Sequence, residues 1–131
     1  MDCVVSQRRA TPGSELGVPV GGVWIPVYVK ACGPSDSSLM IQLMGRYTLN
    51  LISAHPLLVD IPTVSDGLHA YFVHSYHLVP EERAHVVAET NYGGSITAMV
   101  ARDNLAGTQF HPEKSQTLGL KLLANFLKWS P

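Results

Sequence analysis

Runs of apolar residues predict strands over much of the chain. Val23 to Ala31 is β-branched and aromatic, but Pro26 within it removes a backbone donor, so this run is typical of an edge strand. His69 to His77 is rich in aromatic residues and is bounded by turn-forming residues, which favours a buried strand. This part of the chain is therefore expected to be β structure.

A hairpin and a closing helix are predicted further along the chain. Ser95 to Ala101 and Leu105 to Phe110 flank a turn whose Asp and Asn tolerate left-handed backbone, which predicts a hairpin. After Pro112 the apolar residues recur at helical spacing, and Ser115 is a good N-cap, so we expect a helix of about three turns. Strands followed by a strand, a loop and a helix favour an α/β fold with a mixed sheet. The apolar helix positions are Leu118, Leu122, Leu123, Phe126 and Leu127.

Size and charge limit the classes of protein that need to be considered. The 131 residues are enough for one sizeable core, and nine basic residues against ten acidic ones form no run of either sign. Neither nucleic acid nor an anionic membrane surface is an expected partner. No apolar run approaches the roughly 18 residues of a membrane span, and the first residues do not resemble a signal peptide. A cytoplasmic location is expected.

The start of the chain differs in composition from the rest. Residues 1–22 are rich in glycine and proline and show little periodicity, so they are interpreted as an irregular or non-native segment. Residues 23–131 are interpreted as the folded portion. Two cysteines, Cys3 and Cys32, are too few for a disulfide framework and too far apart for a zinc-ribbon pair, which favours a reducing compartment.

The string His111-Pro112-Glu113 has a geometry that suits catalysis. A proline disfavours helical angles at the residue before it, so His111 should be extended at the end of a strand. Residues i and i+2 of an extended chain share a face about 6 to 7 Å apart at Cα, within reach of a carboxylate–imidazole bond. Such a carboxylate fixes the tautomer, so that the second nitrogen can move a nucleophile's proton. The simpler alternative is a strand end followed by a solvated acid.

The longer string Gly107 to Gln116 resembles the signature of class I glutamine amidotransferases, and among them the glutaminase subunit of imidazole glycerol phosphate synthases. The resemblance extends through Tyr71 to Tyr76, His55-Pro56-Leu57 and Met44-Gly45, and takes in Gly119 to Leu127. It implies that residues 23–131 are the carboxyl-terminal portion of that fold, a mixed sheet with flanking helices, in incomplete form.

The resemblance also implies roles for individual residues. His111 would act as the catalytic base and then acid, with Glu113 orienting it, and the backbone of His74-Ser75-Tyr76 would line the glutamine pocket. Tyr71 and Lys114 match positions that face the synthase partner, a cyclase subunit with a (β/α)8 barrel, in a heterodimer. No cofactor is implied. The alternatives are strand-end residues, a packed tyrosine and a solvated lysine.

A metal site at His69, His74 and His77 is not favoured, because residues 74 and 77 of one strand face opposite ways and no cysteine or carboxylate cluster accompanies them. No metal is expected.

The nucleophile of the family is missing from the motifs of this chain. Family members carry a cysteine on a Gly-x-Cys-x-Gly turn, whereas Cys3 follows Asp2 and Cys32 lies between Ala31 and Gly33. The chain looks like the last three-fifths of the subunit, as a truncation, a frameshift or a gene-model error would each produce. Three hypotheses follow: a glutaminase subunit for histidine biosynthesis, an inactive fragment that at most docks on the cyclase, and a sister amidotransferase of purine or tryptophan synthesis.

Overall fold

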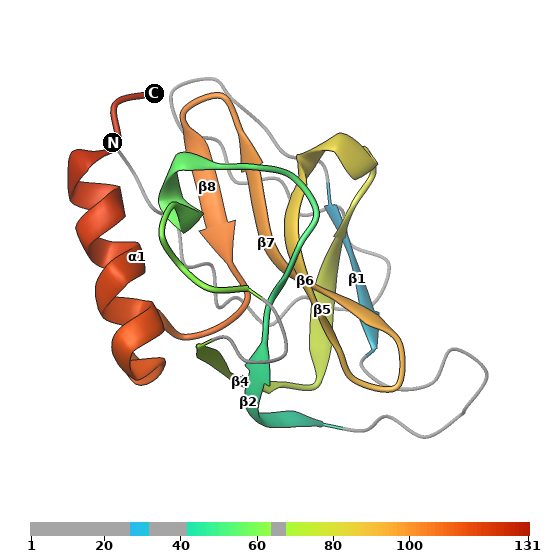
Figure 1. Cartoon of the computed structure of the whole chain (residues 1–131). Helices are drawn as coiled ribbons and strands as arrows, with labels where there is room; N and C mark the ends of the chain where they lie inside the picture. The colour runs from blue at the N-terminus through green and yellow to red at the C-terminus, as the bar shows by residue number, and fades with distance from the viewer. Residues whose placement is uncertain (1–26, 32–41, 64–67) are drawn as a thin grey trace.

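The computed structural model describes residues 27–31, 42–63 and 68–131 (Figure 1). These residues form strands, short 3₁₀ helices and one long α-helix, joined by loops. The strands are β1 (Val27–Ala31), β2 (Leu43–Thr48), β3 (Asn50–Leu51), β4 (His69–His74), β5 (Tyr76–Pro80), β6 (Val86–Asn91), β7 (Ser95–Arg102) and β8 (Leu105–Thr108). The helices are η1 (Pro56–Leu58), η2 (Arg83–His85), η3 (Pro112–Lys114) and α1 (Gln116–Lys128). The fold is mixed α/β, as predicted.

The described strands pair in three groups, and every pairing among them is antiparallel. One group has four strands in the order β3-β6-β7-β8, and the other two are the pairs β2-β4 and β1-β5. The described part of the predicted first strand, β1, pairs with β5 alone. The irregular segment predicted for residues 1–22, and Pro26 of the predicted edge strand, lie outside the described residues.

The predicted hairpin is confirmed. Strands β7 and β8 pair in register from Met99 opposite Thr108 to Arg102 opposite Leu105. Asp103 in the two-residue turn has a φ of 51°, in the left-handed region that Asp and Asn tolerate better than most residues. Strand β8 then ends at Thr108, three residues before His111.

The prediction of one strand from His69 to His77 is wrong. The run divides at Ser75 into β4, which pairs with β2, and β5, which pairs with β1. Each half has a different partner strand, and the chain bends at Ser75 between them. A single serine within an aromatic run is too weak a signal to predict this bend.

The core lies between the strands and helix α1. Phe72 of β4 and Phe110 after β8 are fully buried, and their rings meet edge to face with centroids 5.8 Å apart. Two leucines of α1, Leu118 and Leu122, join this core. Helix α1 packs on η1, η3 and β4, so it holds the residues after β8 in place.

The closing helix is confirmed, but its buried face differs from the predicted one. Leu123 and Leu127 are 45% and 82% exposed. The neighbouring face is instead occupied by polar contacts, because the Asn125 amide donates to the carbonyls of Leu57 and Val59 at 3.0 and 2.8 Å. No helix in the described part of the chain has the length and apolar character needed to cross a membrane.

Candidate active site

His111 lies three residues after the end of strand β8 and immediately before the single turn η3. Its backbone is extended, with φ of −89° and ψ of 105°, and Pro112 occupies the first position of the turn. The His111 N–H donates to the Tyr71 carbonyl at 2.9 Å, which ties the residue to β4. The extended conformation predicted from the following proline is confirmed.

The imidazole of His111 and the carboxylate of Glu113 form the predicted contact. His111 Nδ1 and Glu113 Oε1 are 2.9 Å apart, and the two side chains are 9% and 61% exposed. Hydrogen bonds from its own backbone and from His111 lower the pKa of Glu113, which therefore accepts as a carboxylate. With Nδ1–H donating to Glu113, Nε2 is the nitrogen that would exchange a proton with a substrate.

Ser115 has a different role from the helix cap that was predicted. Its hydroxyl makes no capping bond to α1. It donates to the His111 carbonyl at 2.6 Å and accepts from the Tyr71 N–H at 3.0 Å. Ser115 is 2% exposed, so it joins β4 to the turn that carries His111 and Glu113 without competition from water.

Helix α1 approaches the same turn closely at Gly119. A Cβ built on Gly119 would lie 1.7 Å from the Pro112 carbonyl oxygen, much nearer than any side-chain carbon can be. Any larger residue would push the helix and the turn apart. The absence of a side chain at this position thus sets the distance between α1 and the residue that separates His111 from Glu113.

The ring of His74 stacks on the ring of His111. The two planes differ by 1° and the ring centroids are 5.4 Å apart. His74 Nε2 is buried and has no hydrogen-bond partner in the structure. Burial and then the nearby His111 lower the pKa of His74, while a hydrogen bond with the Gln109 backbone opposes the shift.

The other two residues of the predicted glutamine pocket follow His74. Ser75 forms the break between β4 and β5, and Tyr76 begins β5, so both lie beside the residue that stacks on His111. The Gln109 side chain accepts from the Leu78 N–H at 3.2 Å and connects the end of β8 to β5. The predicted segment and the His111 motif therefore meet in space.

The residues predicted to face a partner, Tyr71 and Lys114, also come together. Lys114 Nζ lies 5.7 Å from the centroid of the Tyr71 ring, within the range of a cation–π interaction. The Tyr71 ring lies 6.3 Å from the ring of His111. Lys114 is exposed and Tyr71 is partly buried.

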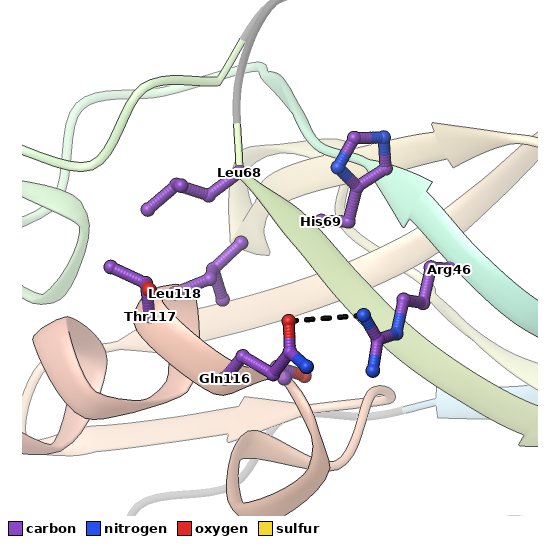
Figure 2. A pocket seen from close by; sticks show the side chains of 7 residues that line it. Arg46, Leu68, His69, Gln116, Thr117 and Leu118 are labelled. Atoms are coloured by element: carbon purple, nitrogen blue, oxygen red, sulfur yellow. Dashed lines mark hydrogen bonds between the residues drawn. The ribbon is translucent and has the colours of Figure 1, made fainter.

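A small open pocket of about 130 Å³ borders this region, on the side of the first turn of α1. Figure 2 shows Arg46 and Gln116 pointing toward one another in it, where Arg46 Nη1 donates to Gln116 Oε1 at 3.0 Å. Gln116, the first residue of α1, has a φ of 48°, so the chain makes a left-handed step where the helix begins. The pocket is lined by Arg46, Leu68, His69, Ser115, Gln116, Thr117 and Leu118.

The other site predictions concern metals and cysteines. In residues 27–31, 42–63 and 68–131, no group of three or more His, Cys, Asp or Glu side chains is arranged to hold a metal ion. His77 lies on β5, where its Nδ1 accepts from the Thr97 N–H at 3.3 Å. Cys3 and Cys32 lie outside the described residues.

Four contributors to the site were missed by the sequence interpretation. They are the hydroxyl of Ser115, the bare Cα of Gly119, the Gln109 amide and the ring of His74. Ser115 and Tyr71 are 44 residues apart, and such a contact leaves no local pattern. A glycine inside a predicted helix was the one available signal, because it costs about 1 kcal/mol relative to alanine and suggests a packing reason.

Comparison with known proteins gives close relatives along almost the whole chain. The chain is 54% identical over 129 residues to imidazole glycerol phosphate synthase subunit HisH of Agrobacterium fabrum, 55% to that of Rhizobium meliloti and 52% to that of Brucella abortus. Each match covers 98% of this chain, and so includes most of residues 1–22, and 60% of the relative. The chain thus spans about 60% of the length of these relatives.

Residues 51–129 match the family model described as glutamine amidotransferase class-I. The match covers more than half of the chain and includes β4, the hairpin β7–β8, the turn with His111 and Glu113, and all of α1. The resemblance first noted in the motif at His111 therefore extends over the residues that position it. The chain belongs to the class-I glutamine amidotransferase family.

Proposed function

We propose that this chain supplies the catalytic base and its orienting carboxylate for glutamine hydrolysis, as the glutaminase subunit of an imidazole glycerol phosphate synthase. The observation that carries the proposal is the 2.9 Å contact between a buried His111 and Glu113 in a member of the amidotransferase family. The identity to HisH subunits supports the choice of synthase. The ammonia would pass to the cyclase subunit for histidine biosynthesis.

In this reaction a cysteine thiolate attacks the side-chain amide of glutamine. His111 takes the proton of the thiol and then gives it to the departing ammonia, while Glu113 holds the imidazole in one tautomer and stabilises its charged form. Water then releases glutamate from the enzyme. The lowered pKa of Glu113 suits this role, because the carboxylate remains charged while His111 gains and loses its proton.

We place the glutamine substrate beside the backbone of His74, Ser75 and Tyr76. These residues end β4 and begin β5, and His74 stacks on His111. A substrate amide in this position would lie near the proposed base. We also propose that Tyr71 and Lys114 contact the cyclase, since both lie beside His111 and Lys114 is exposed.

A second candidate is a chain that binds the cyclase without hydrolysing glutamine. The flanks of Cys3 and Cys32 favour it, because neither cysteine stands in a Gly-x-Cys-x-Gly string. Both candidates require the same docking surface. They differ only in turnover.

Glutamate release separates the two candidates. The purified chain is mixed with the cyclase subunit and glutamine, and glutamate is measured with time. For a glutaminase, His111→Asn and Glu113→Gln should each lower the rate by about 10²- to 10⁴-fold, because each removes part of the acid–base system.

Binding is measured in the same samples with Tyr71→Ala and Lys114→Ala as interface variants. A complex that forms with wild-type affinity but yields no glutamate would contradict the glutaminase proposal and leave the docking candidate. Loss of complex formation in His111→Asn would show misfolding, so binding by that variant is the control for the activity measurement.

A further inference from the structure

Glu113 alone does not fix the orientation of the His111 ring. The torsion between Cβ and an imidazole ring is broad, so packing must restrict the plane of the ring. A partial rotation about this bond would swing Nδ1 away from Glu113 and break the 2.9 Å contact. Since Glu113 is 61% exposed and water can replace it, another contact must oppose this rotation.

His74 provides that contact. Its ring is parallel to the His111 ring within 1° at a centroid distance of 5.4 Å, which is an offset stack. Rotation of the His111 ring would drive its edge into this face. The ring of Tyr71, tilted by 58° at 6.3 Å, borders His111 as well but is not parallel to it.

We propose that the side chain of His74 is a positioning residue for His111: its flat face holds the imidazole in the plane where Nδ1 meets Glu113. The proposal rests on the proposed function, in which His111 is the base. The glutamine-pocket role concerns only the backbone of His74, whereas the present proposal gives a role to its side-chain ring.

The environment of His74 suits a neutral positioning ring. The charged or titratable groups near the pair include Glu113 on η3, which bonds to His111, the Tyr71 phenol on β4, whose ring borders His111, and Lys114, whose cation lies over Tyr71. Burial, and then the nearby His111, lower the pKa of His74. The lowered pKa favours the neutral form of His74, so that its ring adds no charge beside His111.

The test uses the full chain and needs neither glutamine nor the cyclase. Histidine rings labelled with ¹⁵N report which nitrogen of His111 carries the proton. In the wild-type chain we expect a single Nδ1–H tautomer. His74→Phe retains a flat face and should retain that tautomer, whereas His74→Leu fills similar space without a flat face and should give a mixture of tautomers.

His69→Ala is the matched control, because it removes an exposed histidine from the same strand. Glu113→Gln is the positive control for loss of the tautomer. A single tautomer in His74→Leu would overturn the proposal, and so would a mixture in His74→Phe. Neither result depends on turnover, so failure of the glutaminase assay and failure of the stacking proposal are recognised separately.

Discussion

The hydroxyl of Ser115 satisfies two buried backbone groups at once. It donates to the carbonyl of His111 in a buried contact and accepts from the N–H of Tyr71 in a partly buried one. His111 also donates its own N–H to the Tyr71 carbonyl, so two hydrogen bonds hold the turn with His111 and Glu113 against β4, and the third, from Ser115 to His111, lies within the turn. The Ser115 side chain thus helps to fix the position of His111, the proposed base, relative to β4.

Replacing this hydroxyl should be costly. Ser115→Ala leaves the Tyr71 N–H without its acceptor and removes one of the two donors to the His111 carbonyl, which keeps the bond from the Lys114 N–H; we expect the free energy of unfolding to fall by about 1 to 3 kcal/mol. Urea unfolding followed by circular dichroism measures the change. Thr117→Ala, two residues further on at an exposed position, is the control and should change stability by less than about 0.5 kcal/mol. Equal effects of the two substitutions would contradict this account.

Sequence reasoning succeeds at the residue scale where the contact is local. His111 and Glu113 are two residues apart, and the proline between them restricts the backbone, so their contact could be predicted. Ser115 was assigned the common role of a serine before a helix. Its contact with Tyr71 could not be predicted, because Tyr71 is 44 residues away in the sequence. The register of β4 determines which backbone group of that strand faces Ser115.

Among the elements, α1 and η3 are fitted to one another at Gly119. The helix can approach the turn only because position 119 has no Cβ, which would otherwise lie 1.7 Å from the Pro112 oxygen. Packing here opposes local helix propensity, since alanine is the better helix former by about 1 kcal/mol. The close contact with Pro112, rather than helix propensity, therefore accounts for the glycine at position 119.

Gly119→Ala tests which effect dominates. Forcing a methyl group into a filled site typically costs about 1 to 3 kcal/mol, so we expect a net loss of stability in spite of the gain in helix propensity. The measurement is the urea midpoint, together with the amide chemical shifts of residues 111–115. Leu120→Ala is the control, because Leu120 is 72% exposed. A more stable Gly119→Ala chain with unchanged shifts would refute the close contact.

Helices and strands, like individual residues, could be predicted where the signal is local in the sequence. The hairpin and the helix were predictable because their signals are local: an Asp-Asn turn and apolar residues at helical spacing. The division at Ser75 was not predictable, because it depends on β4 and β5 pairing with different strands. The outward position of Leu127 was missed because Asn125 contacts the η1 region instead.

For the molecule as a whole, two histidines connect stability to pH. Burial lowers the pKa of His55, and burial followed by His111 lowers that of His74, both from an ordinary value of 6.5. A histidine with a lower pKa in the folded chain binds a proton more readily when unfolded. Its contribution is therefore complete above the unfolded pKa and is lost as the pH falls below it.

We therefore expect the free energy of unfolding to fall as the pH is lowered from 7 through about 6.5 toward 5. Urea titrations at several pH values measure this slope. The double variant His55→Phe and His74→Phe should be less dependent on pH, and His69→Ala, at an exposed position, is the control. An unchanged slope in the double variant would show that other groups are responsible.

The 44-residue separation between Tyr71 and Ser115 also bears on the order of folding. Strands β7 and β8 are joined by a two-residue turn, so their contacts close quickly and at little cost in loop entropy. The contact between β4 and the turn with His111 and Glu113 must close a much longer loop. We infer that the nascent hairpin forms early, whereas the chain acquires its oriented imidazole only in the last, non-local steps.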